Sequence, residues 1–303
     1  MTGALLACDW GTTNLRAWVL DEAGAVVRTR DFELGVSRLQ PGEAQKRFHD
    51  AVRPALGAET MPAILCGMIG SNLGWQTAPY APCPASRADL AAGMIRVDEL
   101  AHIVPGLICR TTWGASDVMR GEETQILGWL AEAPARSEGR RLVCLPGTHS
   151  KWAVVEDGRI LRFQTAMTGE LFSVLRRHSV LRSPGEPDDP QSFDEGLAAA
   201  GDGSSLAARL FSARARVVGD GKPADTTPSY LSGLLIGAEI ASTLDVLGAK
   251  DGPVALVGDP ALCHWYSRAL TAHHLKHTVH DGADLAVRGL HSLSKLENRH
   301  APG

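Results

Sequence analysis

A hydrophobic segment near the N-terminus ends in a carboxylate, which a short polar turn follows. Residues 4–8 are apolar, Asp9 follows them, and a second apolar run covers 15–20. The turn between them contains Gly11, Thr12, Thr13 and Asn14. This order predicts a strand, a tight turn and a strand. Backbone N–H groups and small hydroxyls in such a turn suit phosphate oxygens, and Asp9 could hold a water on Mg²⁺. A hairpin with a purely structural role is the alternative.

The same pattern recurs in the second half of the sequence. Residues 141–152 again have an apolar run, a Gly-Thr turn and a second run, and they align with the first copy without a gap. Leu145 stands where the first copy has Asp9. The second turn instead offers donors to phosphate, namely Gly147, Thr148, His149, Ser150 and Lys151. Two related lobes that bind one Mg-nucleotide between unlike loops would explain this asymmetry. Lys151 as a solvated strand residue is the alternative.

Composition limits the class of protein. The chain has 303 residues, 44% of them hydrophobic and 21% charged, which is typical of a globular protein with room for two domains. A formal net charge of −4 argues against nucleic acid as the partner. We expect no membrane span, because no uninterrupted apolar stretch reaches about 18 residues. The N-terminus lacks the features of a signal peptide, so we expect a cytoplasmic protein.

Cysteine and histidine spacing predicts neither a disulfide framework nor a zinc site. None of the six cysteines forms a CxxC pair, so we expect reduced core thiols. His273 and His277 lie four residues apart without a third ligand nearby, which favours the surface of a helix end.

The order of expected elements indicates an α/β protein of two similar lobes. In the first half we expect strands at 25–32, 61–68 and 103–108 and helices at 42–56 and 121–130. In the second half we expect a strand at 159–165, a helix at 169–181 capped by Thr168, a loop with one helical piece at 183–205, a helix from Thr227 to Gly248, a strand at 253–258 and a helix at 283–297. We place the lobes at 1–137 and 138–303, with the last helix able to pack back on the first lobe.

A group that could accept a proton is needed beside the phosphate loops if a hydroxyl attacks phosphorus. Glu122 and Glu123 open a helix, where the dipole stabilises their charge, and Asp117 is a third candidate. Acidic residues in a first helical turn are also common for structural reasons. Arg16 or Arg120 could bind a substrate carboxylate.

Glycines and one tryptophan mark further contacts. Gly233 and Gly258 could let adenine and ribose approach the backbone. Trp75, in a glycine-spaced loop, could pack on a sugar or in the core. The sequence contains no Walker A loop, dinucleotide fingerprint, GxSxG elbow or HExxH motif.

Taken together, these motifs resemble the actin, sugar-kinase and heat-shock chaperone ATPase superfamily. Residues 9–14 look like its first phosphate motif, 146–151 like its second, and 254–258 with the following helix like its adenosine motif. The resemblance is narrower still to the 2-dehydro-3-deoxygalactonokinases, over residues 9–18, 66–80, 119–125, 146–152, 167–171 and 232–239. It implies an actin-like fold with a cleft between the lobes, and ATP- and Mg²⁺-dependent phosphorylation of the C6 hydroxyl of 2-dehydro-3-deoxy-D-galactonate in D-galactonate degradation.

The resemblance also suggests residue roles. Glu122 occupies the place of the catalytic Asp of glycerol-type kinases; the residue type departs from that pattern, and Glu123 remains an alternative base. Ser71, Asn72 and Trp75 would contact the sugar chain. Partners would be a sugar acid and ATP, with neither nucleic acid nor membrane, and a homodimer is left open. Two other functions remain: a kinase of a related acid such as the gluconate epimer, and a non-kinase nucleotide-binding protein of the same fold.

Overall fold

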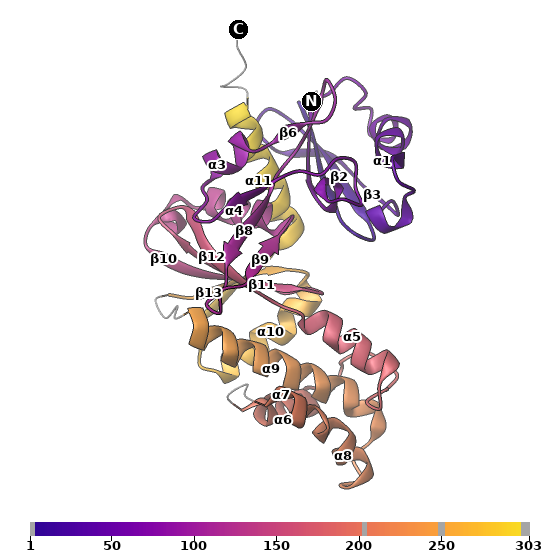
Figure 1. Cartoon of the computed structure of the whole chain (residues 1–303), viewed down its shortest axis with the longest axis vertical. Helices are drawn as coiled ribbons and strands as arrows, with labels where there is room; N and C mark the ends of the chain where they lie inside the picture. Colours follow the sequence, from indigo (N-terminus) through magenta and orange to yellow (C-terminus); the bar gives the residue numbers. More distant parts are fainter. Residues whose placement is uncertain (1–3, 202–204, 248–251, 298–303) are drawn as a thin grey trace. The chain divides into compact units, whose positions relative to one another are not determined.

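The computed structural model describes residues 4–201, 205–247 and 252–297, and the chain divides into two compact units (Figure 1). Unit 1 comprises Met1–Gly139, Val155–Arg162 and Asp281–Gly303. Unit 2 comprises Arg140–Val154 and Phe163–His280.

A six-stranded sheet with the order β3-β2-β1-β4-β7-β6 forms the centre of unit 1. Its strands are β1 (Leu5–Trp10), β2 (Leu15–Leu20), β3 (Val26–Phe32), β4 (Ala63–Gly67), β6 (Ile95–Arg96) and β7 (Ala101–Ile103). Strands β1 to β3 are antiparallel neighbours, whereas β4 runs parallel to β1. Because the carboxyl ends of parallel strands meet at one edge, residues after β1 and β4 come together there.

One face of this sheet is covered by the segment predicted as a single helix at 42–56. It folds as α1 (Glu43–Arg47), a π-helical turn η2 (Phe48–Val52) and α2 (Arg53–Ala55). Phe48 is fully buried and lies 6.3 Å from the Trp10 ring, centroid to centroid. Side chains alternate along a strand, so Asp9 faces the opposite side of the sheet from Trp10.

A second, three-stranded sheet corrects the single strand predicted at 103–108. The strand β7 ends at Ile103. The next strand, β8 (Gly106–Arg110), belongs to the other sheet, where it pairs with β5 (Tyr80–Pro82) and β9 (Ser116–Met119). Pro105, which lacks an N–H, stands between the two strands. Helix α3 (Arg87–Ala92) was not predicted, although its capping box, Ser86 with Asp89, is visible in the sequence.

Two helices of unit 1 lie side by side, α4 (Glu122–Glu132) and α11 (Gly282–Glu297) (Figure 1). The contact depends on a glycine from each helix. A Cβ on Gly128 would lie 1.9 Å from the Leu285 carbonyl oxygen, and one on Gly289 would lie 2.0 Å from that of Thr124. This packing fixes the position of the N-terminus of α4. A short turn, η4 (Pro134–Ser137), follows α4, and η1 (Val36–Arg38) and η3 (Met68–Gly70) complete the unit.

A five-stranded sheet, whose strands come mainly from unit 2 but include residues of 155–162, repeats the order of the first four strands of unit 1. Its order is β12-β11-β10-β13-β14, with β13 parallel to β10. The strands are β10 (Arg140–Leu145), β11 (Ser150–Glu156), β12 (Arg159–Ala166), β13 (Val254–Gly258) and β14 (His277–Asp281). The internal repeat and the predicted α/β fold of two similar lobes are confirmed.

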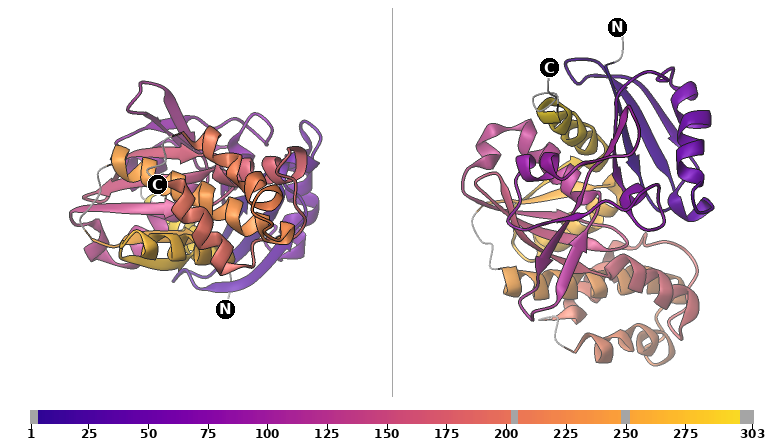
Figure 2. Two further views of the ribbon diagram at one scale, coloured as in Figure 1. Left: turned by 90° about the horizontal axis from the view of Figure 1, so that it is seen from below. Right: turned by 45° about the horizontal axis from the view of Figure 1, so that its top comes forward.

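The helices of unit 2 are α5 (Thr168–His178), α6 (Pro190–Ala200), α7 (Leu206–Leu210), α8 (Ser212–Val218), α9 (Thr227–Leu247) and α10 (Pro260–Ala272), with a short turn η5 (Ala224–Thr226). The loop with one helical piece predicted at 183–205 is found in the described residues: the helical piece is α6, which lies along α9 (Figure 2). A Cβ on Gly233 would lie 2.0 Å from the Phe193 carbonyl oxygen, so the glycine permits helix packing. The predicted end of α9 at Gly248 falls outside the described residues.

Helix α9 is apolar along nearly its whole length. Residues 224–247 are long and hydrophobic enough by composition to cross a membrane, although they hold no uninterrupted apolar run of about 18 residues. Within unit 2, however, 72% of an apolar 18-residue window of this helix is buried, and Leu231, Leu234 and Leu235 belong to the core. The composition is that of a central core helix.

Candidate active site

The first phosphate-loop candidate is a closed turn held from behind. The Gly11 N–H donates to the Asn14 carbonyl over 2.9 Å, which closes the turn between β1 and β2. The carbonyls of Gly11, Thr12 and Thr13 accept from the N–H groups of Val36, Ser37 and Gly35. These bonds fix the backbone of the turn. The side chains of Thr12, Thr13 and Asn14 are exposed, where a ligand can reach them.

Gly35 is a site residue that the sequence reading missed. A Cβ there would lie 2.1 Å from the Thr13 carbonyl carbon and 2.3 Å from the Thr12 carbonyl oxygen. Only a glycine lets the supporting segment approach the loop this closely. The sequence signal was weak: Gly35 follows a predicted strand without a recognised motif.

Asp9 lies at the carboxyl end of β1, next to the end of β4. Asp9 and Cys66 are register partners, and the Cys66 Sγ lies 3.8 Å from Asp9 Oδ1. Gly67 has a φ of +84°, and a Cβ there would lie 3.1 Å from Asp9 Oδ1. Gly121 has a φ of +111°, and its Cβ would lie 3.3 Å from the Gly67 Cα. These two glycines let the N-terminus of α4 approach Asp9.

Burial and neighbouring charges act on the Asp9 carboxylate. Burial raises its pKa to about 6, Arg16 lowers it and Glu122 raises it. Arg16 is the direct partner of Asp9 across β1 and β2, so both side chains leave the same face of the sheet. Sequence alternation had left open which face Arg16 uses. The structure thus brings Asp9, Arg16 and Glu122 together, whereas Asp117 lies on β9 opposite Cys109.

The two glutamates at the start of α4 have different surroundings. Glu122 is half-buried, and its Oε2 accepts from the Arg120 N–H over 3.0 Å. Glu123 is fully buried; its Oε2 accepts from the Gly121 N–H over 2.7 Å, and its Oε1 accepts from Thr124 Oγ1 over 3.2 Å. Burial, with a smaller effect of Glu122, raises the pKa of Glu123 to about 8. Of these two glutamates, Glu122 is the one whose carboxylate solvent or substrate can reach.

Arg120 joins the start of α4 to the glycine-spaced loop. Its Nη2 donates to the Ala78 carbonyl over 2.8 Å, and its guanidinium lies 4.3 Å from the centroid of the Tyr80 ring. A Cβ on Gly70 would lie 2.7 Å from Nη1. The Nε and Nη1 atoms are buried without a hydrogen-bond partner. In this conformation the guanidinium is enclosed by unit 1.

The remaining predicted sugar contacts are divided between surface and core. Asn72 is exposed, whereas Ser71 is buried and its Oγ accepts from the Leu73 N–H over 3.2 Å. The Trp75 ring packs 5.5 Å from Phe48, centroid to centroid, beside the main core of unit 1. The core-packing alternative for Trp75 therefore describes the observed contacts.

The second loop, between β10 and β11, is held by the N-terminus of α5. The Glu170 N–H donates to the Thr148 carbonyl over 3.0 Å, and the Glu170 carboxylate pairs with His149. A Cβ on Gly169 would lie 2.5 Å from the Gly147 carbonyl oxygen, so this position requires glycine. Gly169 is a second site residue that the sequence reading missed.

Several residues near this loop differ from their predicted roles. Ser150 is fully buried, with its hydroxyl 2.8 Å from Tyr266 Oη, so the hydroxyl faces the interior and not a phosphate. Lys151 is buried as well, and its Nζ donates to the His149 carbonyl over 2.9 Å; it is not a solvated strand residue. Thr168 is the first residue of α5, not its N-cap, which is Met167.

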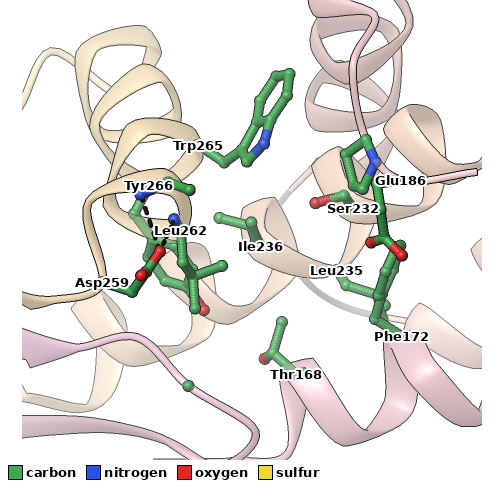
Figure 3. A pocket seen from close by; sticks show the side chains of 14 residues that line it. Thr168, Phe172, Glu186, Ser232, Leu235, Ile236, Asp259, Leu262, Trp265 and Tyr266 are labelled. Carbon is green, nitrogen blue, oxygen red and sulfur yellow. Dashed lines mark hydrogen bonds between the residues drawn. The ribbon is translucent and has the colours of Figure 1, made fainter. Parts of the chain in front are cut away.

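A pocket of about 370 Å³ lies beside this loop within unit 2 (Figure 3). It is lined mainly by apolar side chains of α5, α9 and α10, among them Phe172, Leu235, Ile236, Leu262 and Trp265. Gly147 of the loop and the N-terminal turn of α10 border it, where Asp259 caps the Ala261 and Leu262 N–H groups. Apolar walls with few polar groups suit a flat heterocycle.

The two glycines predicted to admit adenosine do not line this pocket. Gly233 faces α6 and is therefore closed to a ligand, which corrects its predicted role; its neighbour Ser232 lines the pocket instead. Gly258 ends β13, and a Cβ there would lie 3.5 Å from the Pro146 carbonyl oxygen. It borders the turn into α10, next to the lining residue Asp259.

Comparisons with known proteins decide the family. Residues 9–293 match the model of the 2-keto-3-deoxy-galactonokinase family. The chain belongs to this family. A probable 2-dehydro-3-deoxygalactonokinase of Rhizobium meliloti, DgoK1, is 40% identical over 94% of both chains. The 2-dehydro-3-deoxygalactonokinase of Escherichia coli is 35% identical over 97% of this chain and 98% of its own.

Solved structures agree with this family and fold. A Sinorhizobium meliloti crystal structure, thought to be of a 2-dehydro-3-deoxygalactonokinase, superposes with a TM-score of 0.87 at 36% identity, covering 96% of this chain and 98% of that one. The activator of 2-hydroxyisocaproyl-CoA dehydratase from Clostridium difficile, with bound ADPNP, gives 0.55 at 12% identity, covering 100% and 99%, and shows the fold alone. The family is one of kinases on the actin-like ATPase fold, so this chain is an ATP-using enzyme.

Proposed function

We propose that this protein transfers the γ-phosphoryl group of ATP to the C6 hydroxyl of 2-dehydro-3-deoxy-D-galactonate in cytoplasmic D-galactonate breakdown. The observation that carries the proposal is the accessible Glu122 carboxylate next to Asp9, at the ends of β1 and β4, in a chain of this kinase family. The reaction needs only small-molecule partners, so we invoke neither nucleic acid nor a membrane. A homodimer is compatible with it.

Glu122 is our candidate for the group that accepts the proton of the attacking hydroxyl. Its carboxylate is half-buried, whereas that of Glu123 is fully buried and bonded to the Gly121 N–H. A base must reach the proton that it removes, and this favours Glu122. We assign Glu123 a supporting part, since its bonds to Gly121 and Thr124 shape the turn that presents Glu122.

The residues around Asp9 fit a divalent cation. Carboxylate oxygens are hard donors of the kind that Mg²⁺ prefers. Burial disfavours the charged form of Asp9, Arg16 partly offsets this, and Glu122 repels the carboxylate; a cation would favour the charged form further. We therefore propose Asp9 as the metal-side carboxylate, holding Mg²⁺ directly or through a water. When bound, the metal would neutralise charge on the phosphates of ATP.

Arg16 is a better candidate than Arg120 for the carboxylate of the sugar acid. Arg16 is exposed and leaves the sheet on the same face as Asp9. Arg120 already donates to Ala78 and stacks on Tyr80, with two of its nitrogen atoms buried. We propose that Arg120 holds the glycine-spaced loop and that Asn72 on that loop contacts the sugar.

We place the nucleotide in unit 2. The pocket of about 370 Å³ would take the adenosine, with the Gly147–Thr148 turn at its edge for the phosphates. Within unit 1, the turn Gly11–Asn14, with the exposed side chains of Thr12, Thr13 and Asn14, remains our candidate for a phosphate loop.

A coupled assay for ADP release tests the proposal. We expect turnover with ATP, Mg²⁺ and 2-dehydro-3-deoxy-D-galactonate, and little without the sugar acid. If the protein prefers the gluconate epimer in a panel of 2-keto-3-deoxy acids, that epimer is the substrate. Hydrolysis of ATP that no acid stimulates would instead support a non-kinase function.

The Glu122→Gln variant tests the assignment of the base. We expect kcat to fall by about 10²- to 10⁴-fold, because general-base catalysis contributes that much, while affinity for ATP is retained. Near wild-type turnover in Glu122→Gln, with a large loss of turnover in Glu123→Gln, would identify Glu123 as the base instead.

A further inference from the structure

A buried carboxylate in the middle of unit 2 has an unusual number of donors. Glu239, on α9, is 5% exposed. Its Oε1 accepts from Trp152 Nε1 over 2.6 Å, and its Oε2 accepts from Tyr266 Oη over 2.8 Å. The Thr168 side chain also hydrogen-bonds to it. The Ser150 hydroxyl lies 2.8 Å from Tyr266 Oη and so extends this network. These residues come from β11, α5 and α10.

This arrangement suits the ionised form of the side chain. A carboxylate accepts only, and its two oxygens can take about four hydrogen bonds. Burial raises the pKa of Glu239, and the polar side chains of Thr168, Trp152, Tyr266 and Ser150 oppose this effect. A buried charge is costly unless such donors surround it, so each donor is held firmly in place.

The same donors belong to the nucleotide site proposed above. Tyr266 and Thr168 line the pocket beside Gly147 (Figure 3). Ser150 follows the second phosphate turn, and its hydroxyl lies 2.8 Å from Tyr266 Oη and 3.5 Å from the Gly147 carbonyl oxygen. Glu239 itself does not line the pocket, yet it bonds to Tyr266 and Thr168 in its walls, and Tyr266 links it to Ser150 at the end of the turn.

We propose that Glu239 is a positioning residue for nucleotide binding: it sets the relative positions of the Gly147 turn, Thr168 and Tyr266. This inference rests on the proposed placement of ATP in unit 2. Glu239 touches no part of the nucleotide and acts through the hydroxyls of Ser150, Thr168 and Tyr266. No local pattern predicted this role, because it depends on side chains from other elements that meet Glu239 only in the fold.

Trp152 provides a control for a merely structural role. It is fully buried, bonds to the other oxygen of the same carboxylate, and is absent from the pocket lining. Trp152→Phe would leave Glu239 short of one donor without breaking its link to the turn. We expect a lower Tm but an unchanged affinity for nucleotide.

The test is calorimetric titration of the full chain with a non-hydrolysable ATP analogue and Mg²⁺, without sugar acid. We expect Glu239→Gln and Tyr266→Phe each to weaken binding about tenfold, as the loss of a bond to a charged group suggests. We expect the double variant to bind no more weakly than either single one, because both remove the same link. The Michaelis constant for the sugar acid should stay within about twofold in each variant.

Three results would overturn the proposal. One is binding by Glu239→Gln within twofold of wild type; another is an equal loss in Trp152→Phe; the third is strict additivity of Glu239→Gln and Tyr266→Phe. If Glu239→Gln does not fold, the pair Ser150→Ala and Tyr266→Phe carries the same test of non-additivity. A wild type that binds the analogue but phosphorylates no sugar acid would defeat the proposed function and leave this inference standing.

Discussion

The buried Glu123 carboxyl should make the stability of the protein depend on pH. Its pKa rises from the ordinary value of 4.5 to about 8, chiefly because of burial. The folded state therefore holds a proton that the unfolded state releases between these two values. Its stability should fall as pH rises through this window and level off above pH 8.

The size of the effect follows from this shift. A rise in pKa of about 3.5 units corresponds to a total change in stability of ~5 kcal/mol, at about 1.36 kcal/mol per pKa unit. Between about pH 5 and pH 7.5, allowing for partial protonation at both ends, the loss of stability is about 3 kcal/mol.

The substitution Glu123→Gln removes the titrating group, and with it this pH-dependent contribution to stability, but keeps most of the contacts. The glutamine carbonyl can accept from the Gly121 N–H, and the Thr124 hydroxyl can turn to accept from the amide. We expect the variant to gain about 3 kcal/mol over wild type on going from pH 5 to pH 7.5. Urea unfolding of both proteins at several pH values measures this difference. Glu99→Gln, at an exposed position, is the control.

A stability difference between Glu123→Gln and wild type that stays constant from pH 5 to pH 7.5 would refute the reasoning. It would mean that Glu123 titrates alike in the folded and unfolded states, so that solvent reaches the carboxyl despite its burial. A change of the same size in Glu99→Gln would point to a general effect of charge.

Three further predictions concern the site. Arg16→Ala should raise the Michaelis constant for the sugar acid at least about tenfold and leave that for ATP nearly unchanged, because it removes a charge-assisted bond to substrate alone; equal effects on both would place Arg16 on the nucleotide side. Gly169→Ala should raise the Michaelis constant for ATP about tenfold, since the added Cβ would lie 2.5 Å from the Gly147 carbonyl oxygen and displace the turn; unchanged steady-state kinetics would contradict this. As pH falls through about 6, Asp9 becomes protonated and kcat/KM should fall, and more Mg²⁺ should move this limb to lower pH; a flat profile from pH 5 to pH 7 would count against Asp9 as the metal-side group.

Local sequence patterns predicted much of the fold because they depend on neighbours along the chain. Runs of apolar residues and turn residues predicted the two Gly-Thr hairpins and the start of α4. They also predicted β4 and β13, which run parallel to β1 and β10 respectively. The internal repeat appears again as the same order of strands in both sheets. The helical piece predicted within 183–205 is α6, but its bounds could not be predicted, because α6 packs on α9 and local composition does not report this contact.

The sequence by itself determined which residue types are available for chemistry: Asp9 with its polar turn, the second turn at 147–151 and the pair Glu122–Glu123. Only the tertiary structure decided which of them solvent can reach. Burial separates Glu122 from Glu123, turns Ser150 toward Tyr266 and assigns Gly233 to helix packing. Exposure depends on contacts between segments far apart in the chain, and no local pattern encodes these contacts.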